Sequence, residues 1–300
     1  MAVAAAAAIA AAVVAVATAV VVVAAVAAVV ADRFLIVPQR GWELAPEVRV
    51  HARASTPEAD ALAAVFGAFE TPPSPAAFAI STEPVGDRLR VSWRGLALFT
   101  CAPAELAPAL EASLMGWVAR TRAGTLPLHA GAVRWGDRAL LLIGDKGSGK
   151  STLAAQLGAV TDYLGDEIAF VGHDLVVDPF PKAATIKEGA FGVLPPARIW
   201  RDPVRGAVAY HTPRCVSRVA RPIGPLVWPS FSPGLGKASL EVIAPAEAAL
   251  RLVRGAFGGL GRTPRTIEVV ARLAVLPAFT LEFPGVDAAR TALEQAFGPP

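Results

Sequence analysis

Runs of apolar residues, separated by turn residues, predict short strands and helices along most of the chain. Five consecutive apolar residues at 139–143 predict a buried strand, and the segment 152–157, which follows a glycine-rich stretch, predicts a helix. Upstream, 128–133 predicts another strand, which turns at 135–137 and returns as the first one. The pattern therefore predicts a β-hairpin that leads into the glycine-rich stretch, whereas most dinucleotide-binding and P-loop folds enter it through a βαβ crossover.

The residues from 32 to 125 predict a small α/β domain. The sequence Ser-Thr-Pro-Glu at 55–58 is typical of a helix start, because it joins a hydroxyl cap, a proline at the first helical position and an acid. A second helix is predicted over 103–122, and Pro108 within it predicts a kink or a later start. Three strands are predicted between these helices, at 78–81, 88–93 and 96–100.

Beyond the glycine-rich stretch, strands and helices again alternate. The predicted strands are 166–171, 175–177 and 277–283, and the predicted helices are 244–257, 264–274 and 287–297. Residues 199–235 are rich in proline, arginine and turn residues, and their elements are poorly readable from the sequence. An ordered lid is one interpretation of this segment, because closing loops often bring arginines to phosphates.

The N-terminal segment 1–31 is hydrophobic and uncharged. Between residues 2 and 31 it holds 17 alanines and 11 valines, long enough for a helix that spans a bilayer. Arg33 and Arg40 follow it, and by the positive-inside rule they would leave the rest of the chain in the cytoplasm, tethered to the inner membrane by residues 2–31. Alanine contributes little to transfer into lipid, so a dispensable extension or a misassigned start remains the equal alternative. No basic region precedes the run, which argues against a conventional secretory signal.

Composition excludes several classes of protein. The net charge of +3 comes from 23 arginines and five lysines that form no basic block, which argues against a nucleic-acid partner. Two cysteines, Cys101 and Cys215, cannot form a zinc site or a disulfide framework, and both are predicted to be buried apolar residues in a reducing compartment. The four histidines lack the spacing of metal ligands.

The glycine-rich stretch has the form G-x-x-x-x-G-K-[ST], which predicts a phosphate-binding loop. Its glycines let successive backbone N–H groups turn toward a polyphosphate, and the following helix points its positive end at the same phosphates. Lys150 would reach the β- and γ-phosphates and the Ser151 hydroxyl would ligate Mg²⁺. The predicted ligand is therefore ATP with Mg²⁺. The predicted nucleotide contacts are Gly144, Asp145, Lys146, Gly147, Ser148, Gly149, Lys150, Ser151 and Thr152.

Two adjacent carboxylates form a second candidate cluster. Asp166 and Glu167 follow Lys150 by sixteen and seventeen residues, at the start of a predicted strand. Side chains alternate along a strand, so only one of the two is expected to face the phosphates, and we favour Asp166. Asp166 would be the catalytic base, and Glu167 with Ser151 would hold the metal. His129 is predicted on the neighbouring strand, where it would orient an acid or tune its pKa.

These motifs together resemble one known family. Leu128-His129-Ala130, the loop 144–152, Leu164-Gly165-Asp166-Glu167, and Pro179-Phe180-Pro181-Lys182 with Ile186-Lys187 resemble the C-terminal domain of HPr kinase/phosphorylase and its HprK-like relatives. The strand 277–281 and helix start 287–289 are similar to the segment that closes many such domains. Thr152 replaces a second acid of the family, Asp166-Glu167 replaces an Asp-Asp pair, and the downstream glycine-rich signature is missing, so the reverse phosphorylase activity is not implied.

The resemblance covers 126–300 and implies a fold related to phosphoenolpyruvate carboxykinase. It implies transfer of the γ-phosphate of Mg-ATP to a serine hydroxyl, with Asp166 as catalytic base, His129 as its partner, and Lys150 and Ser151 as nucleotide and metal contacts. The phosphoacceptor would be a protein or peptide, either HPr-like or a biosynthetic precursor peptide. Relatives are often hexameric, which implies a homo-oligomer.

Three alternatives differ in class. An ABC-type ATPase would carry its acids far downstream behind a serine-glycine signature, which the chain lacks. A small-molecule kinase would usually place its loop after a lone first strand near the N-terminus, whereas here a hairpin and about 140 residues precede it. The third alternative is an ATP-binding or ATPase regulatory module without protein-kinase activity.

Overall fold

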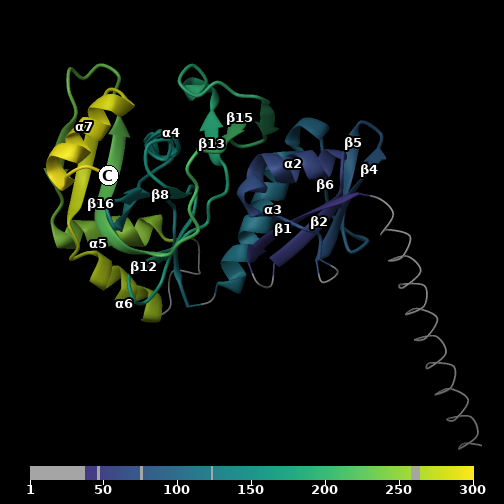
Figure 1. The fold of residues 1–300 in the computed structure, drawn as a ribbon, viewed down its shortest axis with the longest axis horizontal. Coiled ribbons are helices and arrows are strands. Elements are labelled where there is room, and N and C mark those ends of the chain that lie inside the picture. The colour runs from purple at the N-terminus through teal and green to yellow at the C-terminus, as the bar shows by residue number, and fades with distance from the viewer. Residues whose placement is uncertain (1–37, 46–47, 75–76, 123, 258–263) are drawn as a thin grey trace, which may run out of the picture. The chain divides into compact units, whose positions relative to one another are not determined.

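The computed structural model of the chain describes residues 38–45, 48–74, 77–122, 124–257 and 264–300 (Figure 1). Arg40–Pro300 forms one compact unit. The predicted hydrophobic segment 1–31 lies outside the described residues. In the described ranges, no helix is both long enough and apolar enough to cross a bilayer.

The described residues form three sheets, and the first is formed by residues that precede 102. Its strand order is β3-β1-β2-β4-β5-β6, and the three predicted strands are observed as β4, β5 and β6. The strands are β1 (Gln39–Ala45), β2 (Val48–Arg53), β3 (Glu70–Thr71), β4 (Phe78–Val85), β5 (Arg88–Trp93) and β6 (Leu96–Cys101).

Among the described residues, two helices pack against this sheet, and the first begins where the sequence predicts. Thr56 caps α2 (Pro57–Phe66) by accepting a hydrogen bond from the Ala59 N–H at 3.4 Å, with Pro57 at the first helical position. A 3₁₀ turn, η2 (Pro103–Glu105), precedes α3 (Leu106–Thr121), so Pro108 lies in the first α-helical turn. The later start is therefore confirmed, because proline is tolerated where backbone N–H groups lack helical partners.

In the part of the chain that the structure describes, nine strands form the second sheet, and the predicted hairpin is its β8–β9 pair. The order is β10-β8-β9-β16-β12-β11-β7, with β18 pairing to β16 and β17. The strands are β7 (Leu126–Leu128), β8 (Ala130–Trp135), β9 (Arg138–Ile143), β10 (Tyr163–Gly165), β11 (Ala169–Val171), β12 (Val176–Asp178), β16 (Arg221–Phe231), β17 (Ser239–Val242) and β18 (Ala278–Phe283).

Helices cover both faces of the second sheet (Figure 1). Leu141 and Ile143 of β9 belong to the buried cluster that includes α5 and α6, whereas Leu140 and Leu142 belong to the cluster that includes α4 and α7. Side chains alternate along a strand, so burial on both faces explains why 139–143 is apolar without interruption. The helices are α4 (Lys150–Leu157), α5 (Pro245–Gly255), α6 (Pro264–Leu273) and α7 (Val286–Phe297).

The segment 199–235, for which no element is predicted, contains three strands. β14 (Trp200–Asp202) and β15 (Gly206–His211) form a third sheet with β13 (Ala184–Lys187), in the order β13-β15-β14. β16 lies in the middle of the second sheet although it contains three prolines. The register of β16 against β9 shifts between Ile223 and Leu226, and Pro225 lies at this irregularity, where a missing N–H is tolerated. The structure therefore supplies strands in a segment whose elements could not be read from the sequence.

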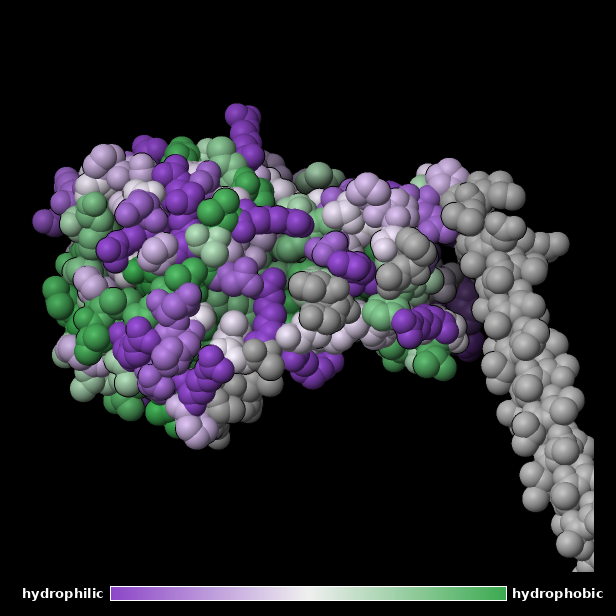
Figure 2. Space-filling view, turned by 60° about the horizontal axis from the view of Figure 1, so that its bottom comes forward, coloured by the Kyte–Doolittle hydropathy of each residue, from purple (hydrophilic) through white to green (hydrophobic). Residues whose placement is uncertain are grey.

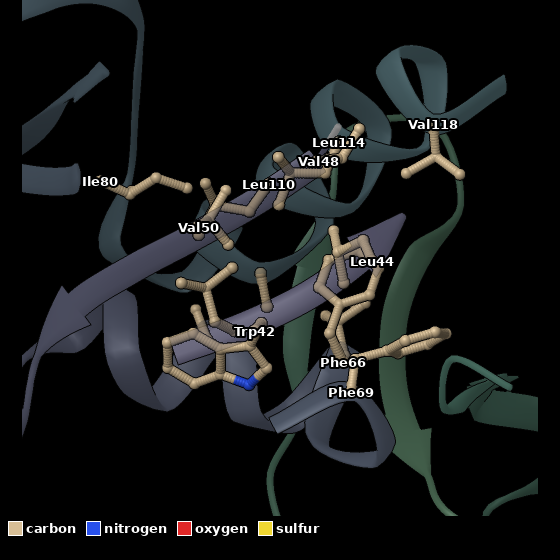
Figure 3. Packing of buried hydrophobic residues seen from close by; sticks show 14 of the residues in the cluster. Trp42, Leu44, Val48, Val50, Phe66, Phe69, Ile80, Leu110, Leu114 and Val118 are labelled. Atoms are coloured by element: carbon tan, nitrogen blue, oxygen red, sulfur yellow. The ribbon is translucent and has the colours of Figure 1, made fainter. Parts of the chain in front are cut away.

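One hydrophobic cluster contains buried side chains that precede residue 125 in the sequence and others that follow it. Figure 3 shows its part from the first sheet and helices, with Trp42 and Leu44 on β1 facing Phe66 and Phe69. The same cluster includes Ile168, Phe170, Phe180, Trp200 and Val208. The mixed α/β class is confirmed, whereas the domain limits 32–125 and 126–300 stay predictions.

The two cysteines differ in exposure. Cys101 is buried as predicted, but Cys215 is exposed, so the prediction for Cys215 is wrong. On the face shown in Figure 2, hydrophilic side chains are interspersed with hydrophobic ones.

Candidate functional site

The glycine-rich loop joins the end of β9 to the start of α4, as predicted. Gly144, Gly147 and Gly149 have φ angles of 151°, 89° and 91°, which L-residues with a Cβ rarely adopt. Gly149 is also crowded, because a Cβ there would lie 3.1 Å from Phe283 Cζ and 3.2 Å from Phe231 Cβ. Glycine is therefore required at position 149 for two independent reasons.

Lys150 is folded back over the loop that precedes it. Its Nζ donates hydrogen bonds to the Gly144 carbonyl at 2.6 Å and to the Asp145 carbonyl at 2.8 Å. Burial lowers the pKa of Lys150, and the nearby carboxylates of Asp166 and Glu167 offset this only in part. The ammonium therefore lies at the N-terminus of α4, where backbone N–H groups and the helix dipole also favour an anion.

The acidic pair lies in a bend and not on a strand. β10 ends at Gly165 and β11 begins at Ala169, and Glu167 has a φ of 70°. The expectation that Asp166 and Glu167 point to opposite faces of one strand is therefore wrong. Gly165 permits this bend, because a Cβ there would lie 2.7 Å from the Phe180 carbonyl oxygen, closer than real Cβ contacts.

Asp166 is fully buried. Burial raises the pKa of its carboxyl group, and the Lys182 ammonium opposes that effect. Oδ2 accepts a hydrogen bond from the Thr185 N–H at 3.3 Å. The Ser151 hydroxyl lies close enough to lower this pKa, but Oδ1 has no hydrogen bond of good geometry within the described residues. Asp166 therefore carries one buried oxygen that is free to accept a further donor.

Glu167 is held from both sides. Its Oε2 pairs with His129 Nε2 at 2.9 Å, and its Oε1 accepts a hydrogen bond from Arg205 Nη1 at 2.9 Å. Burial would raise the pKa of Glu167, but the hydrogen bond from His129 and the charges of Lys182 and Arg205 hold that pKa below its usual range. Glu167 is therefore charged at neutral pH.

His129 lies beside Glu167 and not beside Asp166, the partner that the resemblance implies. It is placed between β7 and β8 and not within one strand over 128–133, and its backbone N–H donates to the Gly255 carbonyl at 2.7 Å. The break lets β7 pair with β11 while β8 pairs with β9. The ring is thereby aimed at the bend that carries Glu167.

A cleft of about 1040 Å³ opens beside the loop. Of the predicted site residues, it is lined by His129, Lys146, Gly147, Gly149, Lys150, Ser151, Thr152 and Glu167, but not by Gly144, Asp145, Ser148 or Asp166. Among the described residues, six cationic side chains line the cleft, and the carboxylates of Glu167 and Asp287 also line it. The cations are Lys146, Lys150, Lys187, Arg205, Arg214 and Arg290. An excess of cations around backbone amides favours a polyanion.

Sequence reasoning missed a buried ionic network behind the cleft. Lys182 is fully buried and its Nζ lies 2.8 Å from Glu111 Oε1, while Arg205 Nη2 donates to Glu111 Oε2 at 2.6 Å. A signal for Glu111 exists in the sequence, because it falls on the helical stripe of Leu110 and Leu114, where an apolar residue is expected. No comparable local signal indicates Arg205.

The donors around the loop fit a magnesium ion that shares its ligands with phosphate. In the described part of the chain, no group of three or more His, Cys, Asp or Glu side chains is arranged to hold a metal. Mg²⁺ usually takes one or two protein ligands, several waters and substrate phosphates. Ser151 and Glu167 line the same cleft, and each Glu167 oxygen keeps a second lone pair beside its hydrogen bond. The two predicted metal ligands are therefore compatible with this chemistry.

Comparisons with known proteins add little. No protein-family model matches the sequence, and no curated protein matches it. Among solved structures, the chain is similar to the Hpr(Ser) kinase/phosphatase from Coxiella burnetii, at 12% identity over 57% of this chain and 95% of that chain, with a TM-score of 0.28. At this TM-score the likeness is distant and defines neither the fold nor the activity of this chain.

Proposed function

We propose that this protein is a Mg-ATP-dependent kinase that transfers the γ-phosphate to a serine hydroxyl of a protein or peptide. One observation carries the proposal. A glycine loop with left-handed turns and a buried lysine opens onto a cation-lined cleft, and Glu167 lines the same cleft with Asp166 next to it in the chain. The motifs that resemble HprK-like kinases are the ones that meet there.

The chain's own groups suffice for binding and for proton removal. The loop N–H groups, Lys150 and the start of α4 would hold the triphosphate, for which Lys150 would exchange its carbonyl partners for phosphate oxygens. A carboxylate would take the proton of the serine hydroxyl while the serine oxygen forms a bond to the γ-phosphorus. The bond between the γ-phosphorus and the β,γ-bridging oxygen breaks at the same time, which releases ADP. Ser151 and Glu167 would hold Mg²⁺, which neutralises phosphate charge when bound.

Asp166 remains the proposed base, although it lies behind the wall of the cleft. Its raised pKa and its unpartnered Oδ1 suit a group that accepts a proton. Its burial requires that the acceptor hydroxyl or one water reach past Glu167, which lines the cleft. The same burial favours the alternative function, an ATP-binding or ATPase module or a small-molecule kinase, in which no bulky acceptor approaches Asp166.

The test uses the full chain with Mg²⁺, γ-labelled ATP, and HPr and the proteins or peptides encoded nearby as acceptors. Lys150→Ala should lose both ATP binding, measured by calorimetry, and transfer of label. Asp166→Asn should bind ATP like the parent but transfer label at least about 100-fold more slowly, because a general base is removed. Glu167→Gln, assayed in parallel, distinguishes the contribution of Glu167 to transfer from that of Asp166.

Each failure has its own meaning. Label that appears only as free phosphate supports the ATPase alternative, and transfer to a small molecule supports the small-molecule kinase. Normal turnover by Asp166→Asn removes Asp166 as the base. If calorimetry shows no heat when Mg²⁺ and ATP are added to the parent protein, the protein does not bind ATP and the proposal is overturned.

A further inference from the structure

Glu111 is a carboxylate of α3 that lies at the centre of the buried ionic network. Its side chain is 4% exposed. Its Oε1 accepts hydrogen bonds from Lys182 Nζ at 2.8 Å and from the Thr185 hydroxyl at 3.1 Å. Its Oε2 accepts from Arg205 Nη2 at 2.6 Å and from the Tyr210 hydroxyl at 2.9 Å. Four donors use all the lone-pair sites of a carboxylate, so Glu111 is a fully committed acceptor.

Each carboxylate oxygen of Glu111 is linked through intervening residues to one member of the acidic pair. On the Oε1 side, Thr185 bonds Glu111 through its hydroxyl and Asp166 through its backbone N–H, and Lys182 acts on Asp166 by its charge. On the Oε2 side, Arg205 bonds both Glu111 and Glu167. Glu111 therefore acts on the two acids through the groups that it bonds, which are Lys182, Thr185 and Arg205.

The charge of Glu111 is paired with the buried Lys182 and the partly buried Arg205. Lys182 is fully buried, and its Nζ also donates hydrogen bonds to the Ala183 carbonyl at 2.9 Å and to the Thr185 hydroxyl at 3.0 Å. Neither of these partners carries a charge, so without Glu111 the ammonium would be drawn toward Asp166. Arg205 would keep Asp202, at 2.7 Å from its Nε, and Glu167. A lysine drawn onto Asp166 would occupy the oxygen that the proposed reaction needs and would weaken that carboxylate as a base.

We infer that Glu111 is a positioning residue for the acidic pair, supplied from the part of the chain that precedes the phosphate-binding half. It keeps Lys182 away from Asp166, and it is one of the carboxylates that fix Arg205 beside Glu167. The site is therefore composite, since α3 contributes to it without lining the cleft. The expected effect of Glu111 on turnover rests on the proposed function, whereas its expected effect on the positions of Asp166 and Glu167 does not.

The test compares Glu111→Gln with Glu58→Gln in the full chain. The matched control removes another buried carboxylate of the same region, one whose Oε2 accepts a hydrogen bond from Thr82 at 2.7 Å and which forms no ion pair within the described residues. Glutamine at 111 would present an amide N–H₂ to groups that are themselves donors. Hydrogen exchange of the amides of 166–168 is expected to accelerate about tenfold or more in Glu111→Gln and to be unchanged in Glu58→Gln.

The kinetic arm measures release or transfer of labelled phosphate. Glu111→Gln is expected to lower kcat about 10- to 100-fold while the KM for ATP stays unchanged, because the acids shift but the loop does not. Glu111→Asp, which restores the charge on a shorter side chain, should recover part of the loss. A parent without turnover would defeat the proposed function, and the exchange arm would still decide the positioning role.

A milder variant guards against failure to fold. Tyr210→Phe removes one of the four donors to Glu111 and lines no part of the cleft. It should accelerate exchange at 166–168 in the same direction by a smaller factor. Exchange at 166–168 that matches the Glu58→Gln control, in either Glu111→Gln or Tyr210→Phe, overturns the inference.

Discussion

Single glycines set the shape of the loop. Gly147 and Gly149 share almost the same φ angle, 89° and 91°, but a Cβ at 147 would meet no atom within 4 Å, whereas one at 149 would meet Phe283 and Phe231. The backbone term alone costs about 1–2 kcal/mol for a residue with a Cβ. The two positions therefore separate backbone strain from crowding.

We predict that Gly149→Ala lowers the free energy of unfolding more than Gly147→Ala does. Both variants should lose about 1–2 kcal/mol from the left-handed backbone, and Gly149→Ala should lose further stability because the two phenylalanines must shift. Urea unfolding of the two variants and the parent measures the difference. Equal losses would show that the packing around Gly149 yields without cost.

At the scale of elements, the position of α4 depends on its packing against β8. The helix has only eight residues and is too short to be stable by itself. Gly131 of β8 lets it approach closely, because a Cβ at 131 would lie 3.0 Å from Ala154 Cβ. Lys150 and Ser151 are carried by the first turn of α4, so this contact sets their position against the cleft.

We predict that Gly131→Ala weakens ATP binding by moving α4 a few tenths of an ångström off the sheet. The double variant Gly131→Ala with Ala154→Gly restores the space and should recover the parent's ATP affinity. It should remain about 1 kcal/mol less stable, because glycine is unfavourable inside a helix. Calorimetry measures the ATP affinity, and urea unfolding measures the stability. An affinity that stays low in the double variant would point to another cause.

At the scale of the whole molecule, the residues before and after 125 are joined by one apolar cluster and one ionic network. Phe180 packs against Phe66 and Phe69 with ring centroids 6.4 and 4.7 Å away. Glu111 adds its bonds to Lys182 and Arg205. Aromatic packing does not depend on pH, whereas the ionic network does.

We predict that acid destabilises the protein partly through Glu111. Burial would raise the pKa of Glu111, but Lys182 and Arg205 outweigh burial and hold that pKa below its ordinary value of 4.5. A lowered pKa in the folded state adds stability above pH 4.5 that is lost as the pH falls through the folded-state pKa. Urea unfolding between pH 7 and pH 3 should show this loss, and Glu111→Gln should show a shallower pH dependence. A slope equal to the parent's would contradict the prediction.

Much of the fold and the loop could be predicted because their signals are local. The hairpin β8–β9, the loop, α4 and the start of α2 each depend on residues within a few positions of one another. These signals depend on residues that are close together in the sequence: strand alternation, helical periodicity, helix caps and glycines at special φ angles. β16 was missed because its prolines argue locally against a strand, while neighbouring strands on both sides stabilise it.

The sequence by itself determined that a strand, a glycine-rich loop and a helix would follow one another with two acids nearby, a pattern that predicts phosphate binding. Only the tertiary structure decided that Glu167, and not Asp166, lines the cleft, and that His129 pairs with Glu167. It alone joined Glu111 to Arg205, 94 positions away. Local patterns fix which elements form, but the pairing of buried charges is settled by packing, because desolvated ions must find whichever partners the fold brings within reach.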